Sequence, residues 1–321
     1  MNHRIKPPRT PKTPVDIHRA APAAAPAWPS YQGTSQFVGT SPSGRVTVYV
    51  DPTLGDQGLQ NAQDLLNNAD NIAAQNDAIF GTTGGAVSVI VFALGGATDG
   101  TGGADHLACD YVNGAAIEVD ASFGSPARVS GLFEAELSEC SMNGNLCGES
   151  TGEALSRWCA TFVSNNALSD FATAPIWFAD GTPDFVDQTD NTDQNADSTG
   201  CGMAFISWLL SQGHSLSQIA PVMVNLGDGG TLAQLYGNLT GDDPANAWTN
   251  FIDAINNLPN GVQNDDPFNG LPNALQKPEQ IAANVRAVLV HASRPVAPTL
   301  CNPGSKRLLP PDKRLKKSKT A

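Results

Sequence analysis

Residues 134–142 read EAELSECSM and lie where the chain changes from strand-like to helix-like patterning. From Ser130 onward apolar residues recur at three- and four-residue spacing, which predicts a helix over 130–142. Glu136 and Glu139 are three residues apart and therefore share one face of that helix. Such a pair most often marks a solvated face, so its meaning depends on the segments before and after it.

The segments before this helix have the pattern of a small sheet. RVTVYVD (45–51) alternates apolar and polar residues and predicts a half-buried strand, with its valines facing inward. The β-branched runs at 86–94 and 115–122 predict two buried strands, and an amphipathic helix is expected from Gln57 to Phe80. Further helices are expected at 149–166, 174–186, 199–213, 215–226, 246–257 and 279–292. This order predicts an α+β fold, in which a small mixed sheet is followed by a helical half.

Composition divides the rest of the 321-residue chain. Residues 1–44 are rich in Pro, Ala, Ser and basic side chains without a sustained period, and a disordered leader is expected there. The folded α+β domain is expected over 45–258, and a linker with a C-terminal helix over 259–300. A basic, disordered tail is expected over 301–321. One large domain of this size can bury a substantial core.

Charge is distributed unevenly around a net value of −13. Between Val46 and Gln276 the only basic side chains are Arg128 and Arg157. Acidic residues lie almost entirely within that span, and those outside it are Asp16, Glu279 and Asp312. An acidic body repels nucleic-acid phosphates, so we expect no nucleic-acid binding by the folded part and expect cations as natural partners. The basic tails could contact an anionic surface, although solvated disorder is the default interpretation.

Cysteine usage and hydropathy bear on the compartment. No uncharged apolar run approaches the roughly 18 residues of a membrane span. The six cysteines form no CxxC pair, and in a lysine-free body they fit an extracytoplasmic protein with disulfides, Cys140–Cys147 being the expected local pair. The Ala/Pro-rich N-terminal region has no apolar core of a signal peptide, so the sequence predicts export without a recognisable signal.

The stretch 135–139 has the spacing of HExxH, the helix motif of zinc peptidases. In that motif two imidazoles bind one metal, and the glutamate between them is the general base. Ala135 and Glu139 stand at the histidine positions, and Glu136 stands at the position of the base. Farther on, WFADGTPDF (177–185) is similar to WxxEGxAxY, which supplies the third zinc ligand in the gluzincins and the plant basic secretory protein family. Over roughly residues 45–226 the chain therefore resembles a divergent zincin-like metallopeptidase without the HExxH histidines.

The resemblance implies a set of site residues. Glu136 would be the general base, Glu139 a metal ligand, and Asp180 the equivalent of the third ligand. All-oxygen ligation favours Ca²⁺, Mg²⁺ or Mn²⁺ over Zn²⁺, because imidazole and thiolate select zinc. Without a metal, two carboxylates could instead act as acid and base, as in glycoside hydrolysis.

A second glutamate cluster offers an alternative. In GESTGEALSRW (148–158) Glu153 precedes Arg157 by four residues, the order that favours a structural ion pair on a helix. Glu153 with Ala154 is also a second match to the EG position of the family motif. In that case Glu153, rather than Asp180, would complete the carboxylate site.

Two further segments have candidate ligands. Asp193, Asn195 and Asp197 follow the spacing of the first half of a calcium loop, although Ala204 stands where an EF-hand needs glutamate. A flexible acidic loop without metal is the simpler interpretation. His106 follows the glycine-rich loop 95–105 and could supply the missing imidazole ligand.

Two hypotheses follow from these patterns. The first is a divergent metallopeptidase-like hydrolase in which Glu136 is the base and Glu139, with Asp180 or Glu153, holds a divalent cation. The second is a non-catalytic secreted binding or structural protein on the same scaffold, with calcium bound at 187–197. Glu136→Gln separates them, because only an enzyme should lose activity with its fold intact.

Overall fold

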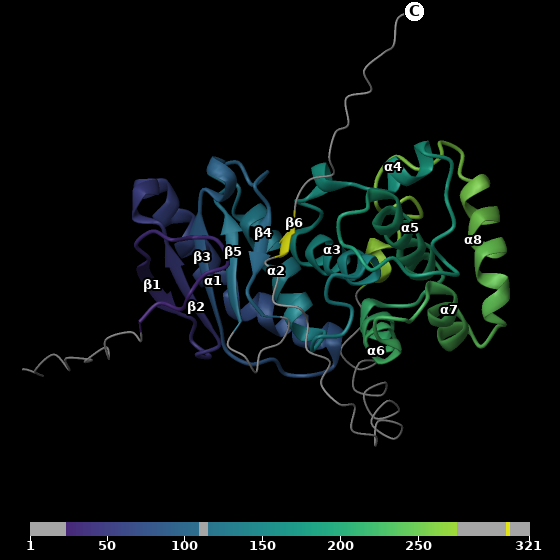
Figure 1. The fold of residues 1–321 in the computed structure, drawn as a ribbon, viewed down its shortest axis with the longest axis horizontal. Helices are drawn as coiled ribbons and strands as arrows, with labels where there is room; N and C mark the ends of the chain where they lie inside the picture. The colour runs from purple at the N-terminus through teal and green to yellow at the C-terminus, as the bar shows by residue number, and fades with distance from the viewer. Residues whose placement is uncertain (1–23, 109–114, 275–305, 309–321) are drawn as a thin grey trace, which may run out of the picture.

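The computed structural model describes residues 24–108, 115–274 and 306–308, and it has the predicted α+β organisation (Figure 1). The strands lie in one half of the molecule, and the helices that follow Glu149 lie in the other half. The predicted helix at 279–292 and most of the basic tails fall outside the described residues. No helix among the described residues is long and apolar enough to cross a membrane.

The sheet has six strands in the described part of the chain, in the order β1-β2-β3-β5-β4-β6. Its centre is parallel and consists of β2 (Val46–Val50), β3 (Val87–Phe92) and β5 (Ala116–Asp120). The outer strands run antiparallel to their neighbours, which makes the sheet mixed as predicted. They are β1 (Gln36–Thr40), β4 (Ala104–His106) and β6 (Lys306–Leu308).

Two helices cover one face of the sheet, namely α1 (Gly55–Phe80) and α2 (Pro126–Ser141). Alternate strand residues pack against them, including the valines predicted to face inward, Val46, Val48 and Val50. An aromatic layer from the N-terminal segment covers the opposite face, where Trp28 packs edge-on against Tyr49 and Tyr31 packs against Phe92. The sheet is thus buried on both faces, as its β-branched central strands require.

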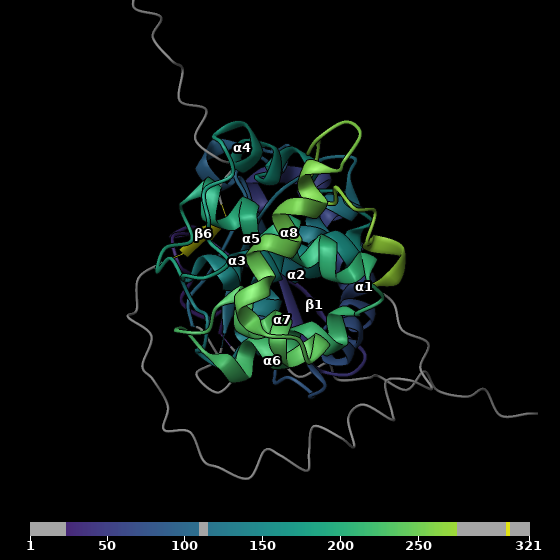
Figure 2. The ribbon, with the colours of Figure 1, turned by 90° about the vertical axis from the view of Figure 1, so that its right-hand side faces the viewer.

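The helical half is built around a separate apolar core (Figure 2). Its helices are α3 (Ser150–Ser164), α4 (Ala174–Ala179), α5 (Ala196–Ser211), α6 (Leu216–Leu226), α7 (Leu232–Thr240) and α8 (Ala247–Asn256). Single 3₁₀ turns occur at Pro52–Leu54, Leu94–Gly96, Ser169–Phe171, Pro244–Asn246 and Leu271–Asn273. Helix α3 packs against both α2 and α5, and it therefore joins the sheet half to the helical half.

The structure corrects several boundaries. The expected disordered leader includes strand β1, whose pairing with β2 shifts register between Phe37 and Gly39, so its alternation is interrupted. Strand β4 and helix α7 were not predicted, because a three-residue strand and a nine-residue helix leave little periodicity to detect. The expected basic tail contains β6, and the expected linker packs partly in the core through Val262 and Ala274.

The glycine-rich loop before β4 folds around a buried carboxylate. Asp120, at the end of β5, accepts hydrogen bonds from the backbone N–H groups of Leu94, Gly100 and Gly102 at 2.9–3.0 Å. Gly100 has a φ of +86°, and a Cβ at Gly102 would collide with the Leu94 carbonyl. Burial raises the pKa of Asp120 to about 6, despite the three N–H donors. This loop fixes the position of β4, the strand on which His106 lies.

Candidate metal centre

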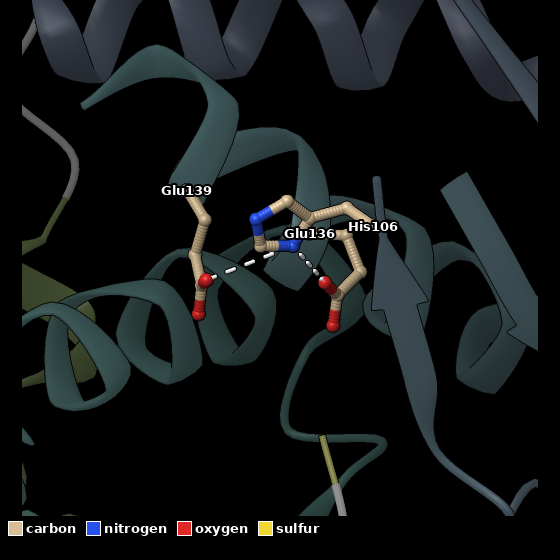
Figure 3. Close-up of side chains that lie close together, drawn as sticks. All are labelled: His106, Glu136 and Glu139. Carbon is tan, nitrogen blue, oxygen red and sulfur yellow. Dashed lines mark hydrogen bonds and ion pairs between the residues drawn. The ribbon is translucent and has the colours of Figure 1, made fainter. Parts of the chain in front are cut away.

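Helix α2 and strand β4 bring three buried side chains together (Figure 3). His106 is the last residue of β4, and Glu136 and Glu139 project from α2 toward its imidazole. The helix packs against β4 and β5, which places one face of its second half beneath the edge of the sheet. The glutamates share that face because they are three residues apart. The predicted carboxylate pair is therefore buried, and is not a solvated helix face.

The distances in this group suit a metal ion. His106 Nδ1 lies 2.6 Å from Glu136 Oε2 and 3.7 Å from Glu139 Oε2. Neighbouring ligands of an ion with bonds of about 2.1 Å lie about 3.0–3.4 Å apart in octahedral or tetrahedral sites. Shifts of about half an ångström would therefore give metal-binding geometry. The ligand atoms of His106, Glu136 and Glu139 lie within 4.8 Å of one another, so the group could hold a metal ion.

The second nitrogen of the imidazole also bears on the site. His106 Nε2 is buried and has no hydrogen-bond partner among the described residues. A buried polar atom without a partner carries a desolvation cost, which an ordered water would relieve, whereas an ion held with the two carboxylates would bind the other nitrogen, Nδ1. The donor set, one imidazole and two carboxylates, is typical of divalent transition metals. The residues present therefore fit a cation.

Glu153 of α3 extends the group toward the helical half. Its Oε1 accepts a 2.6 Å hydrogen bond from Arg157 Nε, which confirms the predicted ion pair. Arg157 also donates through NH1 to the carbonyl of Phe171 at 2.6 Å, so its guanidinium is held from two sides. Burial raises the pKa of Glu153 against the opposing effect of Arg157, and a hydrogen bond links its carboxyl group to Glu139. Glu153 is thus the neighbour of His106, Glu136 and Glu139 on the side of the helical half, in contact with Glu139.

Asp180 lies elsewhere. It is exposed at the C-terminal cap of α4, and its charge raises the pKa of Asp197, for which burial is the larger cause. The metal-binding group does not include it. Asp180 matches the family motif in sequence, but α4 ends too far from α2 for its carboxylate to join Glu136 and Glu139. The alternative match, Glu153, is the one that the structure brings close.

The acidic stretch at 193–197 has a structural role. Asn195 caps helix α5, its side-chain oxygen accepting from the Asp197 N–H at 3.1 Å, and its amide donates to Asp190 at 2.6 Å. Asp193 accepts from the side chain of Gln194 at 2.8 Å. Oxygens of a calcium loop would converge on one point. Here the Asn195 oxygen is used by the helix end and an Asp193 oxygen by Gln194, while Asp197 Oδ1 is buried without a hydrogen-bond partner among the described residues. The charge of Asp193 also reaches Glu153 and helps to raise its pKa.

The cysteines differ from the predicted pairing. Cys140, Cys159 and Cys201 are buried thiols that form no disulfide, whereas Cys147 is disulfide-bonded. The local pair Cys140–Cys147 is therefore wrong, because Cys140 Sγ instead contacts the carbonyl of Ala108 at 3.5 Å. Burial raises the pKa of Cys159 and Cys201, which keeps both thiols protonated and unreactive.

Two buried residues of this region, His106 and Glu134, have little signal in the sequence. His106 belongs to the centre of the group, but as a lone histidine after a loop it gave only a weak signal. Glu134 is fully buried, and neither of its carboxylate oxygens has a hydrogen-bond partner among the described residues. Its position two residues before Glu136 places it on another face of α2, and no sequence pattern gave it a role.

The chain matches no protein-family model, and no similar protein was found among curated proteins or solved structures. Function must therefore be argued from the site.

Proposed function

We propose that this protein is a metal-dependent hydrolase of divergent zincin-like architecture, in which His106, Glu136 and Glu139 hold a divalent cation. One observation carries the proposal: a buried imidazole on strand β4 lies close to two carboxylates of the helix beneath it. Isolated buried charges are costly, and a cation offsets the cost of collecting several carboxylates in one place.

The arrangement of the sheet supports the zincin-like part of the proposal. An antiparallel strand, β4, lies beside the helix that has the HExxH spacing, and α1 and α2 cover the same face of the sheet. The ligands differ from those of the family, because the histidines of the helix are absent and the imidazole comes from the strand. Zincin-like describes the scaffold, and the ligand set is this chain's own.

The His106 imidazole changes which metal ion we expect at this site. An all-oxygen site favours Ca²⁺, Mg²⁺ or Mn²⁺, but a histidine ligand favours transition metals. We therefore expect Mn²⁺ and Zn²⁺ to bind more tightly than Ca²⁺ or Mg²⁺. A bound cation would act as a Lewis acid and would lower the pKa of a coordinated water.

The side chains of the site then divide into roles. Glu136 has the sequence position of the general base, but its carboxylate is engaged with His106 Nδ1 at 2.6 Å and is better placed as a ligand. Glu153 is the carboxyl group that remains for proton transfer. Burial raises its pKa, Arg157 orients it, and it is hydrogen-bonded to the ligand Glu139. A buried carboxyl group with a raised pKa is suited to accept and return a proton during a reaction.

The competing function is a non-catalytic binding scaffold that retains the cation for stability. The absence of both HExxH histidines supports it. Under this alternative the group at α2 would bind metal, but Glu153 would have only a structural role. The disulfide at Cys147 supports an extracytoplasmic location under either hypothesis.

Metal content and hydrolysis separate the possibilities. We expect stoichiometric metal in the wild-type protein loaded with Mn²⁺ or Zn²⁺, measured by elemental mass spectrometry, and at least about a tenfold loss of affinity in His106→Ala and Glu139→Gln. Glu153→Gln should keep the metal but lose hydrolysis of fluorescein-labelled casein. Asp180→Asn is the matched control and should change neither property. Metal binding without hydrolysis in the wild type would support the scaffold, and no metal binding would overturn both.

A further inference from the structure

The strand that carries His106 is itself paired with a distant part of the chain. Strand β4 has β5 on one side, and on the other side β6 (Lys306–Leu308) completes an antiparallel pair. The register places Lys306 directly opposite His106 and Leu308 opposite Ala104. Figure 1 shows β6 in yellow beside β4, far from α8, the last α-helix before it in the described part of the chain. The outer edge of the site is thus occupied by the C-terminal segment.

Without β6, strand β4 would be a sheet edge. An open edge presents unpaired N–H and C=O groups and is a template for pairing with an extended segment. Strand β6 also lies next to α2, the helix that carries Glu136 and Glu139. A segment in this position therefore runs along the two elements that form the candidate metal centre.

The charges along this edge favour a basic partner. The register places Arg307 opposite Asp105, and Asp105 opposite Glu118 of β5. Asp105 and Glu118 are both buried acids. Opposite charges at directly paired positions stabilise a sheet, and like charges destabilise it. The long span from Val46 to Gln276 has only two Lys or Arg residues, so the backbone register joins an acidic part of the chain to a basic one.

We propose that the edge of β4 binds extended basic peptide segments, and that residues 306–308 occupy it in cis and restrict access to the site. The inference deepens the proposed function, and it rests on that function only in taking the bound peptide as substrate. A tethered segment has an effective concentration on the order of millimolar, so it competes strongly with a peptide added in solution. A basic peptide in trans binds when β6 leaves the edge.

Displacement of β6 in the full-length protein tests this proposal. The variant is Arg307→Pro, because proline cannot donate a ladder hydrogen bond and is poorly accommodated in a paired strand. The probe is a fluorescein-labelled synthetic peptide of residues 304–311, GSKRLLPP, followed by fluorescence anisotropy. The control variant Lys316→Glu/Lys317→Glu alters the same basic tail outside β6. A second probe, GSEELLPP, tests the charge preference.

We expect Arg307→Pro to bind the basic peptide at least tenfold more tightly than the wild type or the control variant does. We expect the same variant to bind the acidic peptide at least tenfold more weakly than the basic peptide. Equal affinity in Arg307→Pro and wild type would overturn occupation in cis. No binding by Arg307→Pro, or equal binding of both peptides, would overturn the basic recognition edge. Anisotropy requires neither metal nor turnover, so failure here is distinguishable from failure of the hydrolase proposal.

Discussion

Strand β5 and helix α2 pack against each other, and both bury acidic side chains, but they satisfy the carboxylates in opposite ways. On β5, Glu118 accepts from the Ser30 N–H, the Ser30 hydroxyl and the Tyr31 N–H, and Asp120 accepts three further backbone N–H groups. On α2, Glu136 and Glu139 face His106, and Glu134 has no partner among the described residues.

The difference follows from the backbone. Loops beside a strand have N–H groups that are free to bind a carboxylate, whereas N–H groups inside a helix are already used by carbonyls four residues earlier. Acids on a strand end can therefore be satisfied by the chain itself. Acids in the middle of a buried helix need a titratable partner, a proton or a cation. This contrast separates structural carboxylates from candidate functional ones.

The largest expected effect is on the structural side. Asp120→Ala removes the side-chain acceptor of three backbone N–H groups, of which only Gly100 keeps a second acceptor, the Ala121 carbonyl, so we expect the free energy of unfolding to fall by about 3–5 kcal/mol. Urea denaturation followed by circular dichroism measures it. Asp99→Ala, an exposed acid in the same loop, is the control and should cost less than about 1 kcal/mol. Similar losses in the two variants would contradict the structural role of Asp120.

Metal addition tests the functional side. Mn²⁺ or Zn²⁺ at about 100 times its dissociation constant should raise the free energy of unfolding by about 2.7 kcal/mol, because the unfolded chain has no assembled site. The shift should vanish in Glu139→Gln and persist in Glu118→Gln, as measured by thermal melting with and without EDTA. Loss of the shift in both variants would remove the distinction between the two elements.

Glu134 gives a pH-dependent test, in which Glu134→Gln and the wild type should differ at pH 8 by about 1 kcal/mol or more in the free energy of unfolding. Burial, reinforced by the charge of Asp77, raises its pKa well above the ordinary value. A raised pKa in the folded state gives stability that is present below the unfolded pKa and is lost as the pH rises through the folded pKa. Glu134→Gln should therefore match the wild type near pH 4 and be more stable at pH 8.

The same substitution on β5 should have the opposite sign. Glu118→Gln weakens three charge-assisted hydrogen bonds and should lower the free energy of unfolding at pH 8 by about 1–2 kcal/mol. Denaturation curves of both variants at the two pH values decide the point. Destabilisation by both substitutions at pH 8 would show that Glu134 has a partner in the folded protein.

The smallest effect is expected at Asp180. Its exposed carboxylate lies outside the metal-binding group, so Asp180→Asn should change the free energy of unfolding by less than about 0.5 kcal/mol. Its metal content should equal that of the wild type. A loss of metal in this variant would restore the ligand position that the WFADG motif implies.

The sequence predicted the features that depend on local pattern. The α+β order, the inward valines of β2, the helix with Glu136 and Glu139 and the pair Glu153–Arg157 all have a recognisable spacing. The partner of the glutamates could not be predicted in this way. His106 reaches them only because β4 pairs antiparallel with β5, and β4 is too short for a period. The motif match at Asp180 does not include the position of the end of α4, where Asp180 lies outside the group of His106, Glu136 and Glu139. The calcium-like spacing at 193–197 does not show that Asn195 caps helix α5.

The glycine-rich loop around Asp120 has a further consequence. Its three converging N–H groups form the kind of receptor that other proteins use for phosphate or sulfate, but here the anion is a covalent part of the chain. The Asp120 carboxylate cannot diffuse away because it is part of the chain, and dissolved anions compete with it poorly. The loop therefore needs no lysine to retain its anion, and it holds the histidine-bearing strand in place independently of the ionic composition of the surroundings.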